Sequence, residues 1–437
     1  MSRTTLNIDL NRVEGDLEFQ VDLDGNRVVD ARCVGTLFRG FEQLLIGRAP
    51  KDGLVITPRV CGICGTAHLY TAALALERMA QLPVSPHATL VRNLCLMAEN
   101  VQSDLRQSFL FFTPDFVHPR YAAQPLFADI EAAFAPMKGR IVRSTLAASR
   151  KVVELVAIYG GQWPHSSYML PGGITRGATA RDLMDCQDIV DRTIEWYELD
   201  VIGDSLDNWL ALDSADAFNP DIINEHVRHS WYRPYPGGRH PYIGETVPDY
   251  QPDTDRYTWA KAPRYGDKVI ETGPLAELLT GGDQLIVSLL ALEGPNAWLR
   301  QFARLRRTGL TLHLMKQHLA ELARQLGTPH YLPPPAGALD QGEGYGLVQA
   351  ARGSLGHWIQ VTDGRISRYQ IVTPTAWNAS PKDSAGQHGH WEESVIGVEL
   401  ADPADPIEIG HIVRSHDPCL VCTVHFVGRA ERHRYGV

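Results

Sequence analysis

The stretch Arg59-Val-Cys61-Gly-Ile-Cys64-Gly-Thr-Ala-His68 organises the chain, because two cysteines three residues apart stand where a helical pattern begins. Apolar residues then recur at helical spacing as far as Pro83, at Leu69, Ala72, Ala73, Leu76 and Met79. We therefore predict a helix that starts at the cysteine pair. A helix N-terminus favours the thiolate form of cysteine, which is the form that binds soft metals.

A second cysteine pair stands near the other end of the chain, in Asp417-Pro418-Cys419-Leu-Val-Cys422-Thr-Val-His425. Either pair alone is compatible with half of a structural zinc site, a redox dithiol or two unrelated core cysteines. Zinc ribbons usually place their pairs ~15 to 20 residues apart, whereas these pairs begin at positions 61 and 419. This separation favours a site inside the core of a large enzyme.

Composition predicts one large globular domain over residues 1–437. The chain has 44% hydrophobic and 21% charged residues, and no Gly/Ser-rich linker divides it. A net charge of -10 argues against binding to nucleic acid or anionic lipid. Seven cysteines, an odd number, argue against a disulfide framework and for a reducing compartment. With no long apolar run and no signal peptide in the sequence, we expect no membrane span and a cytoplasmic protein that reaches membranes only through partners.

Two β-hairpins are predicted, one near each end. Alternating apolar residues from Leu17 to Leu23 lead to a turn at Asp24-Gly25. A second alternating run, 357–361, leads to a turn at Asp363-Gly364 and continues through 366–372.

Helical periodicity occupies the middle of the chain. It runs over about 87–112, 137–160, 180–212 and 283–326, the last with a break near Gly309. Residues 219–274 and 328–346 are rich in Pro and Gly and are predicted to be loops. The expected fold class is mainly α with small β elements (α+β), with a central bundle of long helices and a hairpin near each end.

These motifs resemble the large subunit of nickel-iron hydrogenases, in which RxCGxCxxxH pairs with DPCxxCxxH. Four more landmarks of that family occur in order: Arg12-Val-Glu14-Gly15, Arg39-Gly40-Phe-Glu42, Ala351-Arg352-Gly353-Ser-Leu-Gly356-His357-Trp358 and Pro374-Thr375-Ala-Trp377-Asn378. The resemblance implies the nickel-iron hydrogenase large-subunit fold. It also implies an oxidoreductase that interconverts H2 with two protons and two electrons, in the uptake direction.

The resemblance assigns the four motif cysteines to a Ni-Fe(CN)2CO centre. Cys61 and Cys419 are then terminal ligands of nickel, while Cys64 and Cys422 bridge nickel and iron. Sulfur suits nickel because it is soft and strongly donating. The other cysteines, Cys33, Cys95 and Cys186, match no motif and are expected to be small core residues.

The resemblance also assigns the groups around the centre. Heterolytic cleavage of H2 needs a base beside the metal, and the Cys419 thiolate is the candidate. Glu14 would carry the proton outward. Arg352 and Thr375 would donate to the cyanide ligands, and Asp104, Asp417 and Pro418 would pack with Arg352 around the open coordination position.

Two further assignments concern groups at some distance from nickel. His68 follows Cys64 by one helical turn, so its ring would donate to the bridging sulfur. Glu42, His425 and the backbone carbonyl of Ile371 resemble the ligands of a third, hard cation. That cation is usually Mg2+, although an imidazole also accepts iron or manganese.

The cysteine count implies a partner. After four nickel ligands only three cysteines remain, too few for a chain of iron-sulfur clusters. The resemblance therefore implies a small subunit that carries those clusters, in a heterodimer or higher oligomer, together with maturation proteins. A C-terminal endopeptidase often cuts after the residue that corresponds to His425, so 426–437 is either a cleavable or a retained extension.

Three alternatives to an uptake enzyme stay open. A regulatory H2 sensor that signals to a kinase partner has the same site, and Asp16 after the RxEG motif agrees with the uptake and sensing branches. A relative without hydrogenase activity, like the complex I subunit, would lack the four cysteines. A structural zinc protein is the third alternative.

Two other features receive ordinary structural interpretations. Gly342-Glu-Gly344-Tyr-Gly346 is expected to be a flexible turn, because no lysine follows it as in a phosphate-binding loop. His388 and His390 are expected to lie in an exposed loop rather than in a metal-binding tract.

Overall fold

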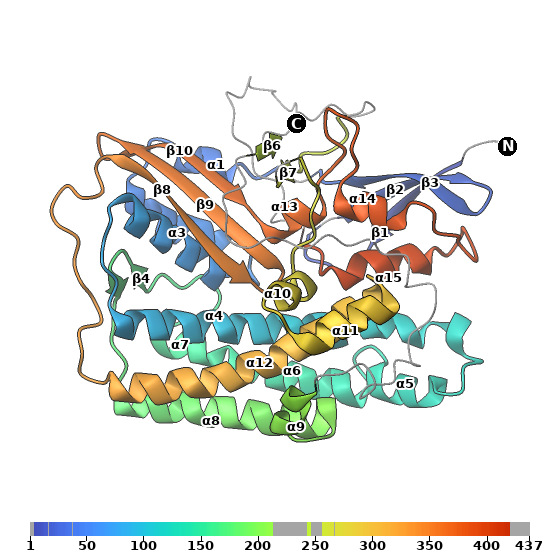
Figure 1. Ribbon diagram of the computed structural model, residues 1–437, viewed down its shortest axis with the longest axis horizontal. Coiled ribbons are helices and arrows are strands. Elements are labelled where there is room, and N and C mark those ends of the chain that lie inside the picture. The colour runs from blue at the N-terminus through green and yellow to red at the C-terminus, as the bar shows by residue number, and fades with distance from the viewer. Residues whose placement is uncertain are drawn as a thin grey trace.

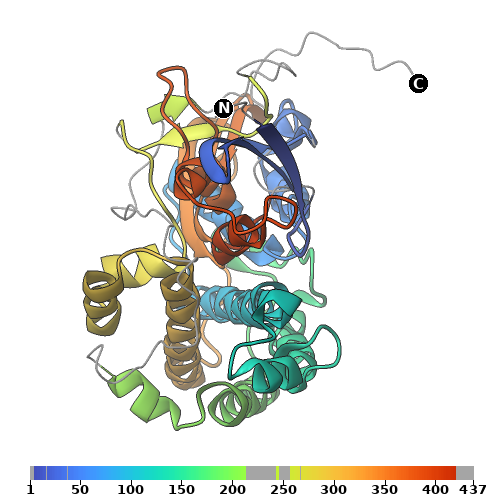
Figure 2. The same cartoon turned by 90° about the vertical axis from the view of Figure 1, so that its right-hand side faces the viewer.

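The computed structural model describes residues 4–15, 17–36, 38–212, 243–245, 256–265 and 267–419. Cys422, His425 and residues 426–437 therefore lie outside the described residues. Long helices form one layer of the molecule, and two three-stranded sheets form the other layer (Figures 1 and 2). This arrangement confirms the predicted α+β class.

The helical layer is built around α4 (Pro86–Arg106) and α12 (Ala297–Arg324), which pack side by side (Figure 1). Ser85 caps α4, and Pro86 at the first helical position has the backbone angle that a helix needs. The remaining members of the layer are α6 (Arg140–Val152), α7 (Glu154–Gly160), α8 (Ala180–Trp196) and α9 (Leu206–Ala211). π-Helical turns extend α4 over Gln107–Phe112 and α8 over Tyr197–Ile202.

The predicted break near Gly309 is wrong, because α12 runs through that glycine without interruption. A Cβ atom at Gly309 would come within 3.0 Å of the Trp209 side chain, so the glycine lets another helix approach closely. The break lies at Gly294, which has a φ of 68° and ends α11 (Gln284–Glu293). Pro295 follows it and cannot continue the helix.

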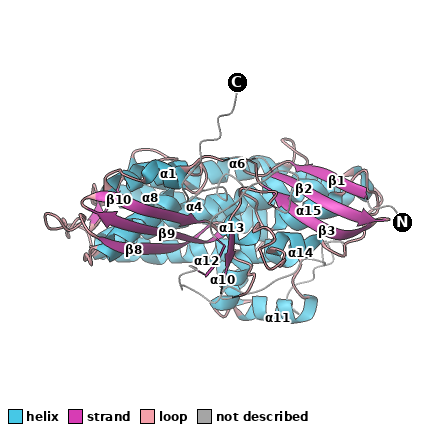
Figure 3. Cartoon of the chain, turned by 90° about the horizontal axis from the view of Figure 1, so that it is seen from above, coloured by secondary structure: helices cyan, strands magenta, loops and turns pink. Residues whose placement is uncertain are grey.

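The two sheets lie at opposite ends of the upper layer (Figure 3). The first sheet is β1 (Thr4–Leu10), β2 (Leu17–Asp24) and β3 (Arg27–Val34). The second is β8 (Gly342–Ala350), β9 (Gly353–Thr362) and β10 (Arg365–Val372). Both predicted hairpins are confirmed, with turns at Asp24-Gly25 and Asp363-Gly364.

The glycine-rich stretch 342–346 begins strand β8, so its interpretation as a flexible turn is wrong. A Cβ atom at Gly346 would meet the Thr71 carbonyl at 2.1 Å, and one at Gly344 would meet the Ala75 carbonyl at 2.4 Å. Glycine therefore allows β8 to lie directly against the backbone of α3 (Gly65–Met79). This contact fixes α3, the helix that the first cysteine pair begins.

Short elements complete the described chain. The predicted loop 328–346 is irregular as far as 341, and the described part of the predicted loop 219–274 holds only short strands. The short helices are α1 (Phe41–Leu45), α2 (Gly53–Ile56), α5 (Phe127–Phe134), α10 (Pro274–Thr280), α13 (Pro374–Asn378), α14 (His390–Val395) and α15 (Ile407–Ser415). The short strands are β4 (Met169–Leu170), β5 (Gly173–Ile174), β6 (Ile243–Glu245) and β7 (Ala262–Arg264).

No single helix among the described residues has both the length and the apolar composition to cross a membrane. Only α10 and α11 taken together meet that test, and they are bent by 116° with respect to each other.

Candidate metal centre

The structure brings the first cysteine pair and Cys419 of the second pair together inside the core. Cys64 caps the N-terminus of α3, and Cys61 lies just before it. The Sγ atoms of Cys61 and Cys419 are 3.7 Å apart, and both side chains are buried. This separation is far longer than a disulfide bond of about 2.05 Å. It equals the edge between two thiolates that share one tetrahedral metal at about 2.3 Å.

The N-terminal segment of the chain holds Cys419 in place. The Glu14 amide donates to the Pro418 carbonyl at 3.2 Å, and Glu14 pairs with Cys419 in a parallel bridge. Asp417 has a positive φ of 59°, which turns the chain sharply from the end of α15 toward Cys419. As a result the proposed proton carrier lies beside the proposed base.

The surroundings of Glu14 change the pKa of its carboxyl group. Burial, followed by the negative charge of the Cys61 thiolate, raises the pKa of Glu14, and Arg352 and Arg39 offset part of that rise. A carboxyl group with a raised pKa exchanges protons closer to neutral pH, as a proton carrier requires.

Arg352 contacts Asp417, which lies two residues before Cys419. Its NH2 atom is 3.1 Å from Asp417 Oδ1, and its Nε donates to the Asp417 carbonyl at 3.2 Å. Burial opposes its charge, but Asp417 and the thiolates of Cys419 and Cys61 raise the pKa of Arg352 well above the ordinary value. Its NH1 atom is buried and has no hydrogen-bond partner among the described residues. An unused buried donor of this kind fits an acceptor such as a cyanide nitrogen.

Asp104 belongs to the same network but does not pair with Arg352 directly. It accepts from Arg307 Nε at 3.0 Å and lies 3.6 Å from Arg304 Nε. Arg307 also donates to the Ala351 carbonyl, next to Arg352. Asp104 therefore supports Arg352 through α12. No motif indicated Arg304 or Arg307.

His68 is part of a buried relay that leads away from the cysteines. Its Nδ1 is 2.9 Å from His357 Nε2, and His357 Nδ1 is 2.9 Å from the Tyr369 hydroxyl. Burial raises the pKa of Tyr369, so its hydroxyl keeps the proton and is able to donate to His357 Nδ1. His357 then donates to His68, which leaves the remaining hydrogen of His68 on Nε2.

The resulting tautomer agrees with the predicted donor role of His68. Burial lowers its pKa to about 4, so the ring is neutral. Its buried Nε2 has no hydrogen-bond partner among the described residues, and the negative charge of the Cys61 thiolate acts on the same ring. The donation to the bridging sulfur itself stays a prediction.

Two of the predicted third-cation ligands, Glu42 and Ile371, meet in the described residues, together with a lysine that no motif indicated. Glu42 Oε1 accepts from the Ile371 amide at 2.6 Å and from the ammonium group of Lys261. Lys261 donates to the Ile371 carbonyl at 2.8 Å. Glu42 Oε2 is buried and has no hydrogen-bond partner among the described residues. Lys261 therefore places its own positive charge between Glu42 Oε1 and the Ile371 carbonyl, and Glu42 Oε2 is the oxygen left to accept a hard cation.

The other predicted residues occupy consistent places. Thr375 is buried in the first turn of α13, and Pro418 joins Asp417 to Cys419. Cys33, Cys95 and Cys186 are buried core residues, as expected. A residue that sequence reasoning missed is Glu99 on α4, which accepts from the amides of Thr66 and Ala67 and so caps α3 beside Cys64.

One sequence interpretation is contradicted in this region. His390 is fully buried at the start of α14, whereas we expected an exposed loop. It is 2.9 Å from His416, the residue before Asp417. The contact partner lies 26 positions further along the chain, so local composition could not indicate the burial.

The described residues fit a nickel-iron group. Two buried sulfurs stand at the spacing of shared metal ligands, a buried arginine has one unused donor, and a carboxyl group with a raised pKa lies beside them. Soft thiolate donors of this kind suit nickel and low-valent iron.

The comparisons with known proteins agree with this assignment of the site. The family model described as "Nickel-dependent hydrogenase" matches residues 39–136 and 201–425. The "Periplasmic [NiFeSe] hydrogenase large subunit" of Desulfomicrobium baculatum is 32% identical over 97% of this chain and 95% of its own length. The "Uptake hydrogenase large subunit" of Afipia carboxidovorans is 25% identical over 95% of this chain and 94% of its own length.

A solved structure agrees in fold over the same extent. The Ni-Fe-Se hydrogenase from D. vulgaris Hildenborough in the reduced state superposes with a TM-score of 0.79 at 28% identity. The superposition covers 97% of this chain and 100% of that one.

Proposed function

The chain belongs to the nickel-dependent hydrogenase family as a catalytic large subunit, and we propose that it cleaves H2 at a Ni-Fe(CN)2CO centre in the uptake direction. The observation that carries the proposal is the 3.7 Å separation of Cys61 and Cys419 Sγ beside Glu14 and Arg352. The relative from A. carboxidovorans, which is named an uptake hydrogenase, supports the direction.

The ligand assignment follows the motifs. Cys61, Cys64, Cys419 and Cys422 would hold the nickel-iron group through their thiolate sulfurs. When bound, the centre supplies two-electron chemistry toward H2. Arg352 donates from NH1 to a cyanide ligand while Asp417 fixes its guanidinium group from the other side. Thr375 on α13 supplies a second donor.

Protons leave through the chain's own side chains. The Cys419 thiolate would take the proton and the Glu14 carboxylate would receive it, and the backbone bridge between the two residues places them side by side. The raised pKa of Glu14 reduces the difference in proton affinity between this carboxyl and the thiol, so the transfer is less uphill. His68 donates from Nε2 toward sulfur and reduces the negative charge there.

A hard divalent cation, Mg2+ in the first instance, completes the proposed centre. Glu42 Oε2, the Ile371 carbonyl and His425 are its proposed ligands, and Lys261 adjoins them. The cation would tie α1, which carries Glu42, to β10, which carries Ile371.

The assembly that we propose is a heterodimer or a higher oligomer. The family membership as a large subunit implies a small subunit, and we propose that it holds the iron-sulfur clusters. Maturation proteins and removal of 426–437 by an endopeptidase are further proposals. The D. baculatum relative is named periplasmic, and the cytoplasmic localisation predicted for this chain is a proposal that cell fractionation tests.

The deciding experiment is infrared spectroscopy with metal analysis on the chain co-purified with its partner. We expect cyanide and carbonyl stretching bands together with one nickel per chain. Zinc without such bands, in protein made with the maturation machinery present, would overturn the nickel-iron assignment. Bands with nickel but slow turnover and binding to a kinase would instead indicate a sensing role.

A further inference from the structure

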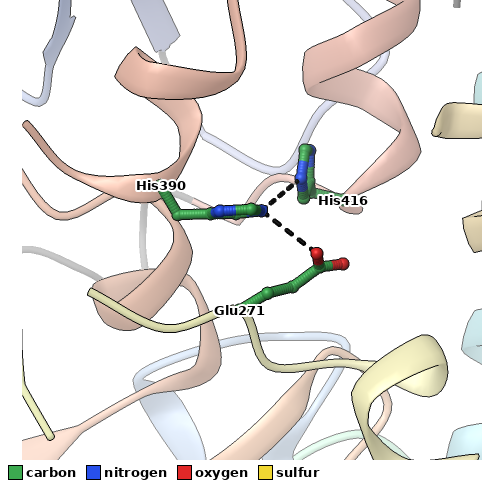
Figure 4. A group of neighbouring side chains, drawn as sticks. All are labelled: Glu271, His390 and His416. Atoms are coloured by element: carbon green, nitrogen blue, oxygen red, sulfur yellow. Dashed lines mark hydrogen bonds and ion pairs between the residues drawn. The ribbon is translucent and has the colours of Figure 1, made fainter. Parts of the chain in front are cut away.

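A second group of metal-binding side chains lies outside the cysteine site. Glu271, His390 and His416 are buried, and one ligand atom from each lies within 4.8 Å of the others (Figure 4). They come from three separate segments: the segment before α10, the start of α14 and the end of α15.

The distances in this group match the edges of a metal coordination shell. His390 Nε2 is 2.9 Å from His416 Nε2 and 3.2 Å from Glu271 Oε2. Two ligand atoms at about 2.0 to 2.1 Å from one zinc ion are separated by about 2.9 Å at a right angle and about 3.4 Å at the tetrahedral angle. Both distances fall in this range, and the third pair, Glu271 and His416, lies within 4.8 Å.

Two of the three ligands, His416 and Glu271, are oriented by a second contact, as metal ligands in proteins usually are. His416 Nδ1 is 2.9 Å from the Ile412 carbonyl, which places its hydrogen on Nδ1 and its lone pair on Nε2. Arg300 donates from Nε to Glu271 Oε1 at 2.7 Å and from NH2 to Oε2 at 2.8 Å. The carboxylate therefore keeps a fixed orientation, with a lone pair of Oε2 toward the imidazoles.

The three facing atoms of this group have one hydrogen fewer than their hydrogen bonds require. Glu271 Oε2 and His416 Nε2 are both acceptors, and both face His390 Nε2. One hydrogen on His390 Nε2 points at only one of them at a time. A metal ion at the point where the three atoms converge would satisfy all three.

Two of the three ligands, Glu271 and His416, hold no proton on the atom that faces the others. Although burial raises it, the pKa of Glu271 is about 2 because Arg300 and His390 lie beside the carboxylate. Burial, and then the positive charge of Arg300, lower the pKa of His416 well below its ordinary value. No proton has to leave either group when a metal binds.

The positive charge of Arg300 does not exclude an ion. Because Glu271 and Arg300 cancel, an ion that displaces the proton of His390 would meet two neutral imidazoles and a net neutral pair. The net charge is then the same as in the three-imidazole zinc site of carbonic anhydrase. Arg304 also places a positive charge near His416. Asp104 Oδ1 lies 3.6 Å from Arg304 Nε and compensates part of that charge.

We propose that Glu271, His390 and His416 bind a divalent transition metal, of the class of zinc or iron(II), as a structural site separate from the four cysteines. Two imidazoles and one carboxylate are a common donor set for these ions. The ion joins α14 and α15 to the segment before α10. One of its ligands, His416, lies three residues before Cys419. The proposal does not depend on the reaction at the cysteines.

Zinc binding to the nickel-loaded complex tests the proposal directly. The chain with its partner is incubated with zinc, passed through a desalting column and analysed for nickel and zinc. We expect one zinc per chain in the wild type and in His388→Gln, a matched change two residues away from His390. His388 contacts Glu392 and Asp30 instead of the three ligands. We expect at least about 10-fold weaker zinc binding in His390→Gln.

Zinc X-ray absorption of the wild type is the second measurement, and it does not need a variant that folds. Two imidazoles in the zinc shell, with oxygen and no sulfur, support the site. The proposal is wrong if the wild type retains no zinc, if the zinc shell contains sulfur, or if His390→Gln binds zinc as tightly as the wild type.

Discussion

The cysteine site and the Glu271–His390–His416 group are both buried and both join distant parts of the chain, yet only the first was visible in the sequence. Cys61 and Cys419 each bring a second cysteine three residues away, so each half-site has its own local pattern. Glu271, His390 and His416 each come alone from a different segment. Local spacing therefore reveals a site only where a single segment supplies at least two of its ligands.

The largest effect should come from removing one thiolate. In Cys61→Ser we expect nickel to fall below about one tenth of an equivalent and H2 oxidation to disappear, since loss of even a supporting residue costs up to about 100-fold in metal affinity. Elemental analysis and an H2 uptake assay measure this. The control is Cys95→Ala, a buried cysteine outside the motifs, which should keep nickel and lose about 1 kcal/mol of stability. Equal nickel loss in both variants would contradict the assignment.

The second effect concerns the buried ion pair that supports the Glu271–His390–His416 group. Arg300→Met leaves the buried Glu271 carboxylate without its partner, which costs about 3 to 5 kcal/mol. Thermal unfolding of the complex should show a marked drop, while Arg324→Met, which breaks an exposed pair with Glu321, should change stability by less than about 1 kcal/mol. If Arg300→Met unfolds at the wild-type temperature, the Arg300–Glu271 pair is not a structural element.

The third effect concerns proton transfer alone. Glu14→Gln should retain both metals and lose about 100-fold or more in H2/D2 exchange, the usual effect of removing a general acid or base. Because burial raises the pKa of Glu14, wild-type exchange should begin to fall on acidification at a higher pH than for an ordinary carboxyl near 4.3. Glu18→Gln on β2 is the control. Full exchange in Glu14→Gln would remove Glu14 from the path.

The smallest effect should come from the relay behind His68. Tyr369→Phe removes the donor that sets the tautomers of His357 and His68, at a cost of about 1 kcal/mol. We expect shifted cyanide and carbonyl infrared bands and unchanged nickel content. Tyr70→Phe, which removes a hydroxyl bonded to Asn93, is the control and should leave the bands in place. Unshifted bands in Tyr369→Phe would show that the relay does not act on the centre.

Much of the fold followed from periodicity. The hairpin around Asp24-Gly25 and the helix after Cys64 are where alternation and helical spacing predicted them, because each pattern repeats over several neighbouring residues. Gly309 and Gly346 were misinterpreted for one shared reason. Glycine lowers local propensity, but here it admits a neighbouring element whose approach no local pattern records.

The candidate site was predictable where residues lie in motifs and not where they act from a neighbouring element. Arg307 and Lys261 are single charged residues whose roles arise only when α12 and the segment before β7 fold against Asp104 and Glu42. The residues around His390 in the sequence are polar, so a loop was expected. Its burial depends on a contact with His416, which lies 26 positions further along the chain. Contacts of this kind cannot be obtained from one segment of sequence.

The contact between Cys61 and Cys419 has a consequence for biosynthesis. The two residues are 358 positions apart, so closing that loop costs about 5 kcal/mol of chain entropy. At about 5 to 20 residues per second, a ribosome needs about 20 to 70 s to make the intervening chain. Throughout that interval the first thiol pair exists without the second. The order of synthesis thus provides a period in which Cys61 and Cys64 are accessible. This period ends when the segment that contains Cys419 pairs with Glu14.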